Sequence, residues 1–183
     1  MNASNLTRWS GLAAVAAGIL FTIINFITLL ILGFGQGLSE LLIRSVISPI
    51  AGTLLVLGLV GLYTRQVEAT DVVGLLSFLL AFFGTMLALA GNIWANLLAY
   101  LGWALFGVTS LQARIYPPIA AVLLTIGAVV TAPFSTLTVS GFGSILVYIS
   151  LIASTIFNIA IVWLGFVLFT EKGTSAEHPD RAT

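Results

Sequence analysis

Long apolar stretches separated by a few charged residues are the main pattern of this sequence. The six basic and six acidic residues leave uncharged runs of 31, 20, 42 and 56 residues, between Arg8 and Glu40, Arg44 and Arg65, Asp71 and Arg114, and Arg114 and Glu171. A helix needs about 20 apolar residues to cross a bilayer, so each of the first two runs holds one helix. A single helix of the third run would be about 63 Å long, twice the hydrocarbon thickness, so that run holds two. The fourth run holds two helices and a loop, which makes six.

Glycine and proline mark the helix ends within the longer runs. Gly91-Asn92 interrupts the third run, Pro117-Pro118 opens the fifth helix, and Pro133 closes it. The pattern predicts an all-α, polytopic transmembrane bundle of six helices, forming a single domain over residues 1–170. We expect the helices at about 9–34, 45–64, 72–90, 94–112, 117–133 and 143–170, followed by a disordered cytoplasmic tail over residues 171–183.

The basic residues predict the orientation of the bundle, because arginine and lysine accumulate in cytoplasmic segments. If both termini are cytoplasmic, Arg44 is the one basic residue in an outer loop. The other five then lie on the cytoplasmic side: Arg8, Arg65, Arg114, Lys172 and Arg181. We therefore expect the N- and C-termini in the cytoplasm.

Composition agrees with a lipid environment and excludes several classes of function. Charged residues make up 7% of the chain and apolar ones 60%, whereas soluble domains are about a quarter charged. Net charge is zero and there is no basic stripe, which argues against nucleic-acid binding. No Asp, Glu, Lys, Arg or His falls within a predicted span and cysteine is absent, so proton relays, axial haem histidines and activated nucleophiles have no residues to build on. We expect no catalytic, metal or cofactor site and no enzymatic activity.

Neutral polar residues form rows on the first and last predicted helices. On the first helix, Thr22 and Asn25 lie on the same face as Gly11, Ala14 and Gly18. On the last helix, three polar residues repeat every four positions. The candidate polar seam consists of both sets: Thr22, Asn25, Ser150, Ser154 and Asn158. Polar groups in lipid must find partners, so both rows should face the bundle interior. They suit either a path for a small solute or interhelical hydrogen bonds worth about 0.6 kcal/mol each. Two amide side chains are too few to line a path for a solute, which favours the interpretation as interhelical hydrogen bonds.

The third predicted helix carries a heptad of small residues at spacings of 3-4-3-4-3. This candidate packing seam consists of Gly74, Ser77, Ala81, Gly84, Ala88 and Gly91. Small side chains let a second helix approach closely along the whole span. The partner helix could belong to the same chain or to a second subunit of a homo- or hetero-oligomer, and the sequence leaves both open.

Two segments of the chain resemble each other. Residues 49–60 and 118–129 are identical at seven of twelve positions, at a constant offset of 69. They open the second and fifth predicted helices, which cross the bilayer in opposite directions, as in the inverted repeats of many transporters. Apolar segments also match by chance, so the sequence does not decide between a repeat and coincidence.

The helix ends resemble those of a known group of proteins. The runs Gly58-Leu59-Val60-Gly61-Leu62-Tyr63-Thr64-Arg65-Gln66, Ala104-Leu105-Phe106-Gly107 and Leu111-Gln112-Ala113-Arg114, with residues 120–128, are similar to stretches of small, uncharacterised bacterial multi-pass membrane proteins. The resemblance covers about half of the chain. It implies a bacterial plasma (inner) membrane and no particular activity.

Two hypotheses for function follow. The favoured one is a non-catalytic membrane component that binds lipids or other lipophilic ligands, or takes part in protein interaction or assembly. The alternative is a small channel-like or facilitative transporter for a neutral solute. A solvated cavity reaching Asn25 and Asn158 would favour the transporter, and a dry core with an exposed small-residue face on the third helix would favour the interaction protein.

Overall fold

The computed structural model describes residues 3–34, 46–92, 94–139 and 144–170, and this part of the chain is all-helical. Its six helices are α1 (Ala3–Phe34), α3 (Ser48–Gln66), α4 (Val72–Leu89), α5 (Ala95–Ala113), α6 (Pro118–Val139) and α7 (Ser144–Thr170). The all-α prediction and the number of helices are therefore confirmed for the described residues. The predicted tail over residues 171–183 lies outside them.

Most helix ends fall within a few residues of the predicted ones, and two differ for clear reasons. α6 continues through Pro133 to Val139 instead of ending at the proline. Proline removes one backbone N–H, but neighbouring helices and hydroxyl groups make this tolerable in an apolar bundle. α1 begins at Ala3, before the apolar run. Hydropathy indicates where an apolar environment begins, whereas the helix itself extends into the polar residues before it.

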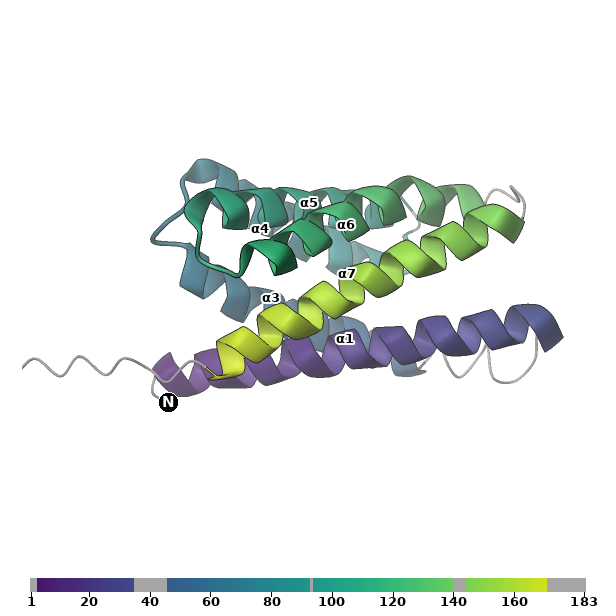
Figure 1. The fold of residues 1–183 in the computed structure, drawn as a ribbon, viewed down its shortest axis with the longest axis horizontal. Helices are drawn as coiled ribbons and strands as arrows, with labels where there is room; N and C mark the ends of the chain where they lie inside the picture. Colours follow the sequence, from purple (N-terminus) through teal and green to yellow (C-terminus); the bar gives the residue numbers. More distant parts are fainter. Residues whose placement is uncertain (1–2, 35–45, 93, 140–143, 171–183) are drawn as a thin grey trace, which may run out of the picture.

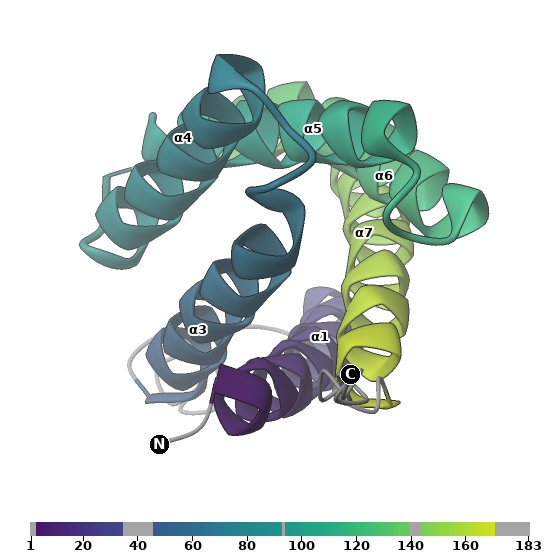
Figure 2. The ribbon, with the colours of Figure 1, turned by 90° about the vertical axis from the view of Figure 1, so that its left-hand side faces the viewer.

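The six helices form a ring, seen end-on in Figure 2. Each helix packs on its neighbours in the chain, and α1 packs extensively on α7, which closes the ring. α3 and α4 share far fewer contacts than any other neighbouring pair. α3 and α6, which carry the two similar segments, lie on opposite sides of the ring (Figure 2). The two halves are packed unequally, because α6 and α7 share many more contacts than α3 and α4.

Four of the helices are long and apolar enough to cross a membrane. They are α1 over Asn5–Leu30, α3, α4, and α7 over Ile145–Thr170. α5 is not among these four, yet its Thr109 and Ser110 are buried. A hydropathy scale counts these two residues as if they were exposed, although they face the interior. Together with the apolar outer faces of the helices, the four spans support a membrane protein.

Aromatic and aliphatic side chains fill the middle of the ring. Trp103 and Phe106 of α5 are fully buried, and Trp103 makes an edge-to-face contact with Phe157 of α7 at 5.5 Å between ring centroids. Leu59 and Leu62 of α3 complete this layer. The ring is therefore closed across its middle by packed side chains.

The small-residue seam on α4 lies mainly against α5. Gly74, Ser77, Ala81 and Gly84 are buried, Ala88 is half-buried and Gly91 is exposed in the turn after the helix. A Cβ atom on Gly84 would lie 2.6 Å from Ala99 Cα, and one on Gly102 would lie 2.6 Å from Ala81 Cα. Backbones at such separations exclude any larger side chain. Over this stretch, the seam and its partner helix belong to the same chain.

A candidate ligand site between five helices

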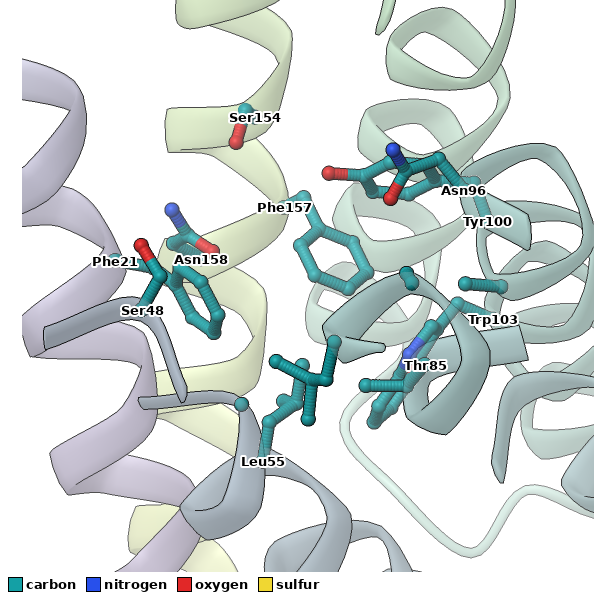
Figure 3. Close-up of a pocket in the computed structure, with 14 residues that line it drawn as sticks. Phe21, Ser48, Leu55, Thr85, Asn96, Tyr100, Trp103, Ser154, Phe157 and Asn158 are labelled. Carbon is teal, nitrogen blue, oxygen red and sulfur yellow. The ribbon is translucent and has the colours of Figure 1, made fainter. Parts of the chain in front are cut away.

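A cavity of about 170 Å³ lies inside the ring, lined by residues of α1, α3, α4, α5 and α7 (Figure 3). Its polar lining residues are Ser48, Thr85, Asn96, Tyr100, Ser154 and Asn158, and its aromatic ones are Phe21, Tyr100, Trp103 and Phe157. None of the described residues that line it carries a charge. We call it the central cavity.

The helix ends place the central cavity near one end of the bundle. Ser48 is the first residue of α3, Leu89 is the last residue of α4, and Asn96 lies in the first turn of α5. The connection between α4 and α5 is short because Gly91 adopts a left-handed conformation, with φ of +89°. The cavity therefore lies beside the α4–α5 turn, and Trp103 forms its floor toward the middle of the bundle.

Two buried polar atoms on the walls of the central cavity have no hydrogen-bond partner among the described protein atoms. They are the Asn158 Nδ2 amide of α7 and the Thr85 Oγ1 hydroxyl of α4, in side chains that are 2% and 7% exposed. The two residues approach the cavity from opposite walls (Figure 3). A buried polar group left without a partner costs about 1–3 kcal/mol. Each atom has less than 1 Å² of accessible surface, so a molecule inside the cavity would reach it after a rotation of the Asn158 or Thr85 side chain.

The structure divides the polar seam among three environments. Asn25 Nδ2 of α1 donates to Ser154 Oγ of α7 at 3.1 Å, and Thr155 Oγ1 lies 3.4 Å away. Thr22 Oγ1 donates to the Gly18 carbonyl of its own helix at 2.8 Å. Asn158 faces the central cavity, and Ser150 is half-buried. The five residues of the polar seam therefore form no continuous path for a solute, and only some of them make interhelical hydrogen bonds.

Ser154 links the α1–α7 contact to the central cavity. Its hydroxyl accepts the bond from Asn25, and it lines the central cavity together with Tyr100 of α5. Asn25 itself does not line the central cavity but a separate apolar groove of about 390 Å³ between α1 and α7. Asn25 thus orients a cavity residue from outside the cavity.

A second polar cluster lies toward the opposite end of the bundle and is not among the residues singled out from the sequence. Gln66 is fully buried at the end of α3, where its Nε2 donates to Thr109 Oγ1 at 2.7 Å. Ser110 Oγ donates to Gln66 Oε1 at 2.9 Å. We call these three residues the Gln66 cluster. Gln66 directly follows Arg65 in the sequence, and the predicted spans place it in a loop. The adjacent polar residues Thr109 and Ser110 on α5 are the sequence feature that could have indicated a buried polar partner.

Tyr116 and Arg65 cover the Gln66 cluster. The Tyr116 hydroxyl donates to the Leu62 carbonyl at 2.8 Å, and the Arg65 guanidinium lies 4.7 Å from the centre of the Tyr116 ring. A smaller set of polar residues, including Asp71 and Thr109, lines another cavity of about 220 Å³ at this end. The chain therefore has polar cavities near both ends, with packed aromatic side chains between them.

Comparisons with protein-family models, with curated proteins and with solved structures found no match for this chain. The described lining residues offer amide and hydroxyl groups and aromatic walls, the features of a site for a small molecule.

Proposed function

We propose that this chain is a non-catalytic membrane protein that binds a small, uncharged, amphiphilic ligand in the central cavity. The single observation that carries the proposal is the pair of unpartnered groups, Asn158 Nδ2 and Thr85 Oγ1, on opposite walls of one cavity. The amide is a hydrogen-bond donor and the hydroxyl is both donor and acceptor. A ligand with a carbonyl, ester, ether or hydroxyl oxygen would satisfy both.

The size and charge of the cavity limit the ligand further. Its volume of about 170 Å³ lies below the roughly 300–1,000 Å³ typical of drug-sized sites, so it suits a small molecule or the head of a larger one. A charged group would meet no counter-charge among the described residues that line the cavity, which is costly in an apolar bundle. Tyr100, Trp103 and Phe157 supply apolar surface for the remainder of the ligand.

The proposal includes a topology of six membrane-spanning helices in a bacterial inner membrane, with both termini cytoplasmic. The five-to-one distribution of basic residues supports the orientation. The start of α1 and the end of α7 lie at the same end of the bundle (Figure 1), where the Arg8 guanidinium is 5.5 Å from the centre of the Phe169 ring. The central cavity would then lie in the outer half of the membrane.

A second candidate function is facilitated passage of a neutral solute. Its support is the second polar cavity, which lies on the same α4–α5 pair and shares Thr109 with the Gln66 cluster. The layer of Leu59, Trp103 and Phe106 separates the two cavities. Passage would require this layer and the Gln66 cluster to open, whereas binding requires no rearrangement of the core.

Quenching of Trp103 fluorescence by a small nitroxide tests the binding proposal. Trp103 is buried in the cavity wall, so replacing the three outer tryptophans by phenylalanine (Trp9→Phe, Trp94→Phe and Trp163→Phe) leaves one reporter. The probe is TEMPO, which is uncharged, carries an acceptor oxygen and dissolves in both water and lipid. We expect TEMPO quenching to saturate in this background and to become linear with concentration in Asn158→Leu and Thr85→Val.

The controls separate binding from folding. Ile159→Leu alters a lipid-facing neighbour of Asn158 and should leave saturation unchanged. Asn158→Leu should be as stable as the parent or more stable, because it removes a buried amide that has no partner. Quenching that never saturates in the parent, or that saturates equally in both cavity variants, would contradict ligand binding at this site.

A further inference from the structure

The wall between α3 and α4 is the weakest part of the ring around the central cavity. These helices share the fewest contacts of any neighbouring pair. Toward the Gln66 cluster they are held by stacked rings, Tyr63 on Phe78, at 4.2 Å between centroids. At the level of the cavity, Leu89 of α4 lies directly against Gly52 of α3, where a Cβ atom would lie 2.8 Å from Leu89 Cδ1. Among the described residues, the flexible Leu89 side chain fills the contact between α3 and α4 at this level.

The residues around this contact show that it separates the cavity from the outside of the bundle. On α3, the cavity-lining Ser48 and Leu55 lie on one side of Gly52, and the exposed Thr53 lies on the other. On α4, the cavity-lining Thr85 lies on one side of Leu89, and the exposed Met86 lies on the other. If Leu89 turned away, the cavity would open sideways between Thr53 and Met86.

This outer rim suits lipid rather than water. Met86 is 47% exposed and apolar. The Thr53 hydroxyl donates to the Pro49 carbonyl of its own helix at 2.8 Å, so this exposed side chain needs no hydrogen bond from water. Gly52 lies in the second turn of α3 and Leu89 ends α4, which places the contact near the ends of both spans. That is the depth at which lipid headgroups and ester groups lie in a bilayer.

We propose that the ligand of the central cavity is a membrane lipid with a small uncharged headgroup, which enters sideways between α3 and α4 past Leu89. The inference rests on the proposed binding function and names its ligand class and route. The head, bearing hydrogen-bond acceptors, meets Asn158 and Thr85 inside the ring, while the hydrocarbon chain stays between the helices and in the bilayer. The described residues that line the cavity include no cation to pair with a phosphate, which favours an uncharged head.

A reversible block of the route tests this proposal in the full chain. The sequence has no cysteine, so Gly52→Cys with Leu89→Cys creates a unique pair. The two Cβ atoms would be within about 4.5 Å, the separation that a disulfide spans. The protein, with Trp103 as its only tryptophan, is reconstituted into phosphatidylcholine vesicles. The lipid probe is methyl 5-doxylstearate, and the control probe is phosphatidylcholine carrying the same 5-doxyl chain.

The methyl ester should quench Trp103 more strongly than the labelled phosphatidylcholine at the same mole fraction. Oxidising the cysteine pair should abolish this excess, and reduction should restore it. The Leu89→Cys single variant should keep the excess under oxidising conditions. Leu89→Ala, which shortens the closing side chain without a crosslink, should raise the rate at which quenching develops after the probe is added.

Other results would overturn the route or the function separately. If the excess persists in the oxidised pair, entry between α3 and α4 is wrong. If acrylamide, an uncharged amide confined to water, quenches Trp103 while the methyl ester shows no excess, the ligand is water-borne. In both cases saturable quenching by TEMPO would still support binding in the cavity, whereas loss of that saturation would refute the binding function itself.

Discussion

Three glycine-to-alanine substitutions provide a quantitative test of how closely the helices approach each other. Gly84→Ala and Gly102→Ala each direct a new methyl group at backbone atoms of the facing helix, 2.6 Å from Ala99 Cα and Ala81 Cα respectively. Gly52→Ala directs the same methyl group at the end of the Leu89 side chain, where the nearest atoms include Cδ1 at 2.8 Å. All three substitutions add one methyl group, but at Gly84 and Gly102 it meets backbone atoms, whereas at Gly52 it meets a flexible side chain.

The expected free energies follow from two opposing effects. Alanine is favoured over glycine inside a helix by about 0.8–1.0 kcal/mol. Overfilling a packed contact costs about 1–3 kcal/mol, and a backbone obstacle belongs at the upper end because neither helix can yield locally. Gly84→Ala and Gly102→Ala should therefore lose about 2 kcal/mol each. Gly52→Ala should be neutral or gain up to about 1 kcal/mol, because Leu89 can change rotamer.

Unfolding in mixed micelles, followed by circular dichroism as dodecyl sulfate is added to a mild detergent, measures these differences. Phe83→Leu is the matched control on α4, since Phe83 precedes Gly84 and is 54% exposed on the outer face. It should change stability by less than about 0.5 kcal/mol. Equal destabilisation by Gly84→Ala and Gly52→Ala would refute the argument that backbone contact, rather than glycine itself, makes the α4–α5 interface sensitive.

Two further predictions concern topology and the closed end of the bundle. Single cysteines at Glu68 and Arg114 should react with a membrane-impermeant maleimide added on the cytoplasmic side, and a cysteine at Asn92 should react from the opposite side. If Glu68→Cys and Arg114→Cys react from different sides, the six-span topology is wrong. Gln66→Ala should lower stability by about 1–3 kcal/mol because it removes the amide that joins Thr109 to Ser110. If it also makes vesicles containing the protein permeable to glycerol, while Phe83→Leu does not, the facilitator function gains over simple binding.

The sequence predicted the helices well because charge spacing and helix length are local properties. The heptad ending at Gly91 indicated a close contact along α4, but the facing row of small residues on α5, Ala95, Ala99 and Gly102, was not singled out from the sequence. The central cavity could not be predicted, since it depends on the separation of α3 and α4, which no single helix encodes. Asn158 was singled out as polar, yet its place beside Thr85 required the ring. Gln66 was missed because hydropathy places a polar residue after an arginine in a loop.

The closure of the ring between its first and last helices has a consequence for biosynthesis. Gly11 of α1 lies against Gly165 of α7, with a Cβ atom on Gly11 only 2.8 Å from the Gly165 carbonyl oxygen, and Gly18 similarly faces the Asn158 carbonyl. The helix made first therefore waits for the helix made last, and until then its glycine face has only lipid beside it. A chain truncated before α7 would keep five helices but expose that face, together with the polar groups of Asn25. In such an unfinished chain the Asn25 amide would lack the Ser154 hydroxyl that accepts its hydrogen bond in the complete ring.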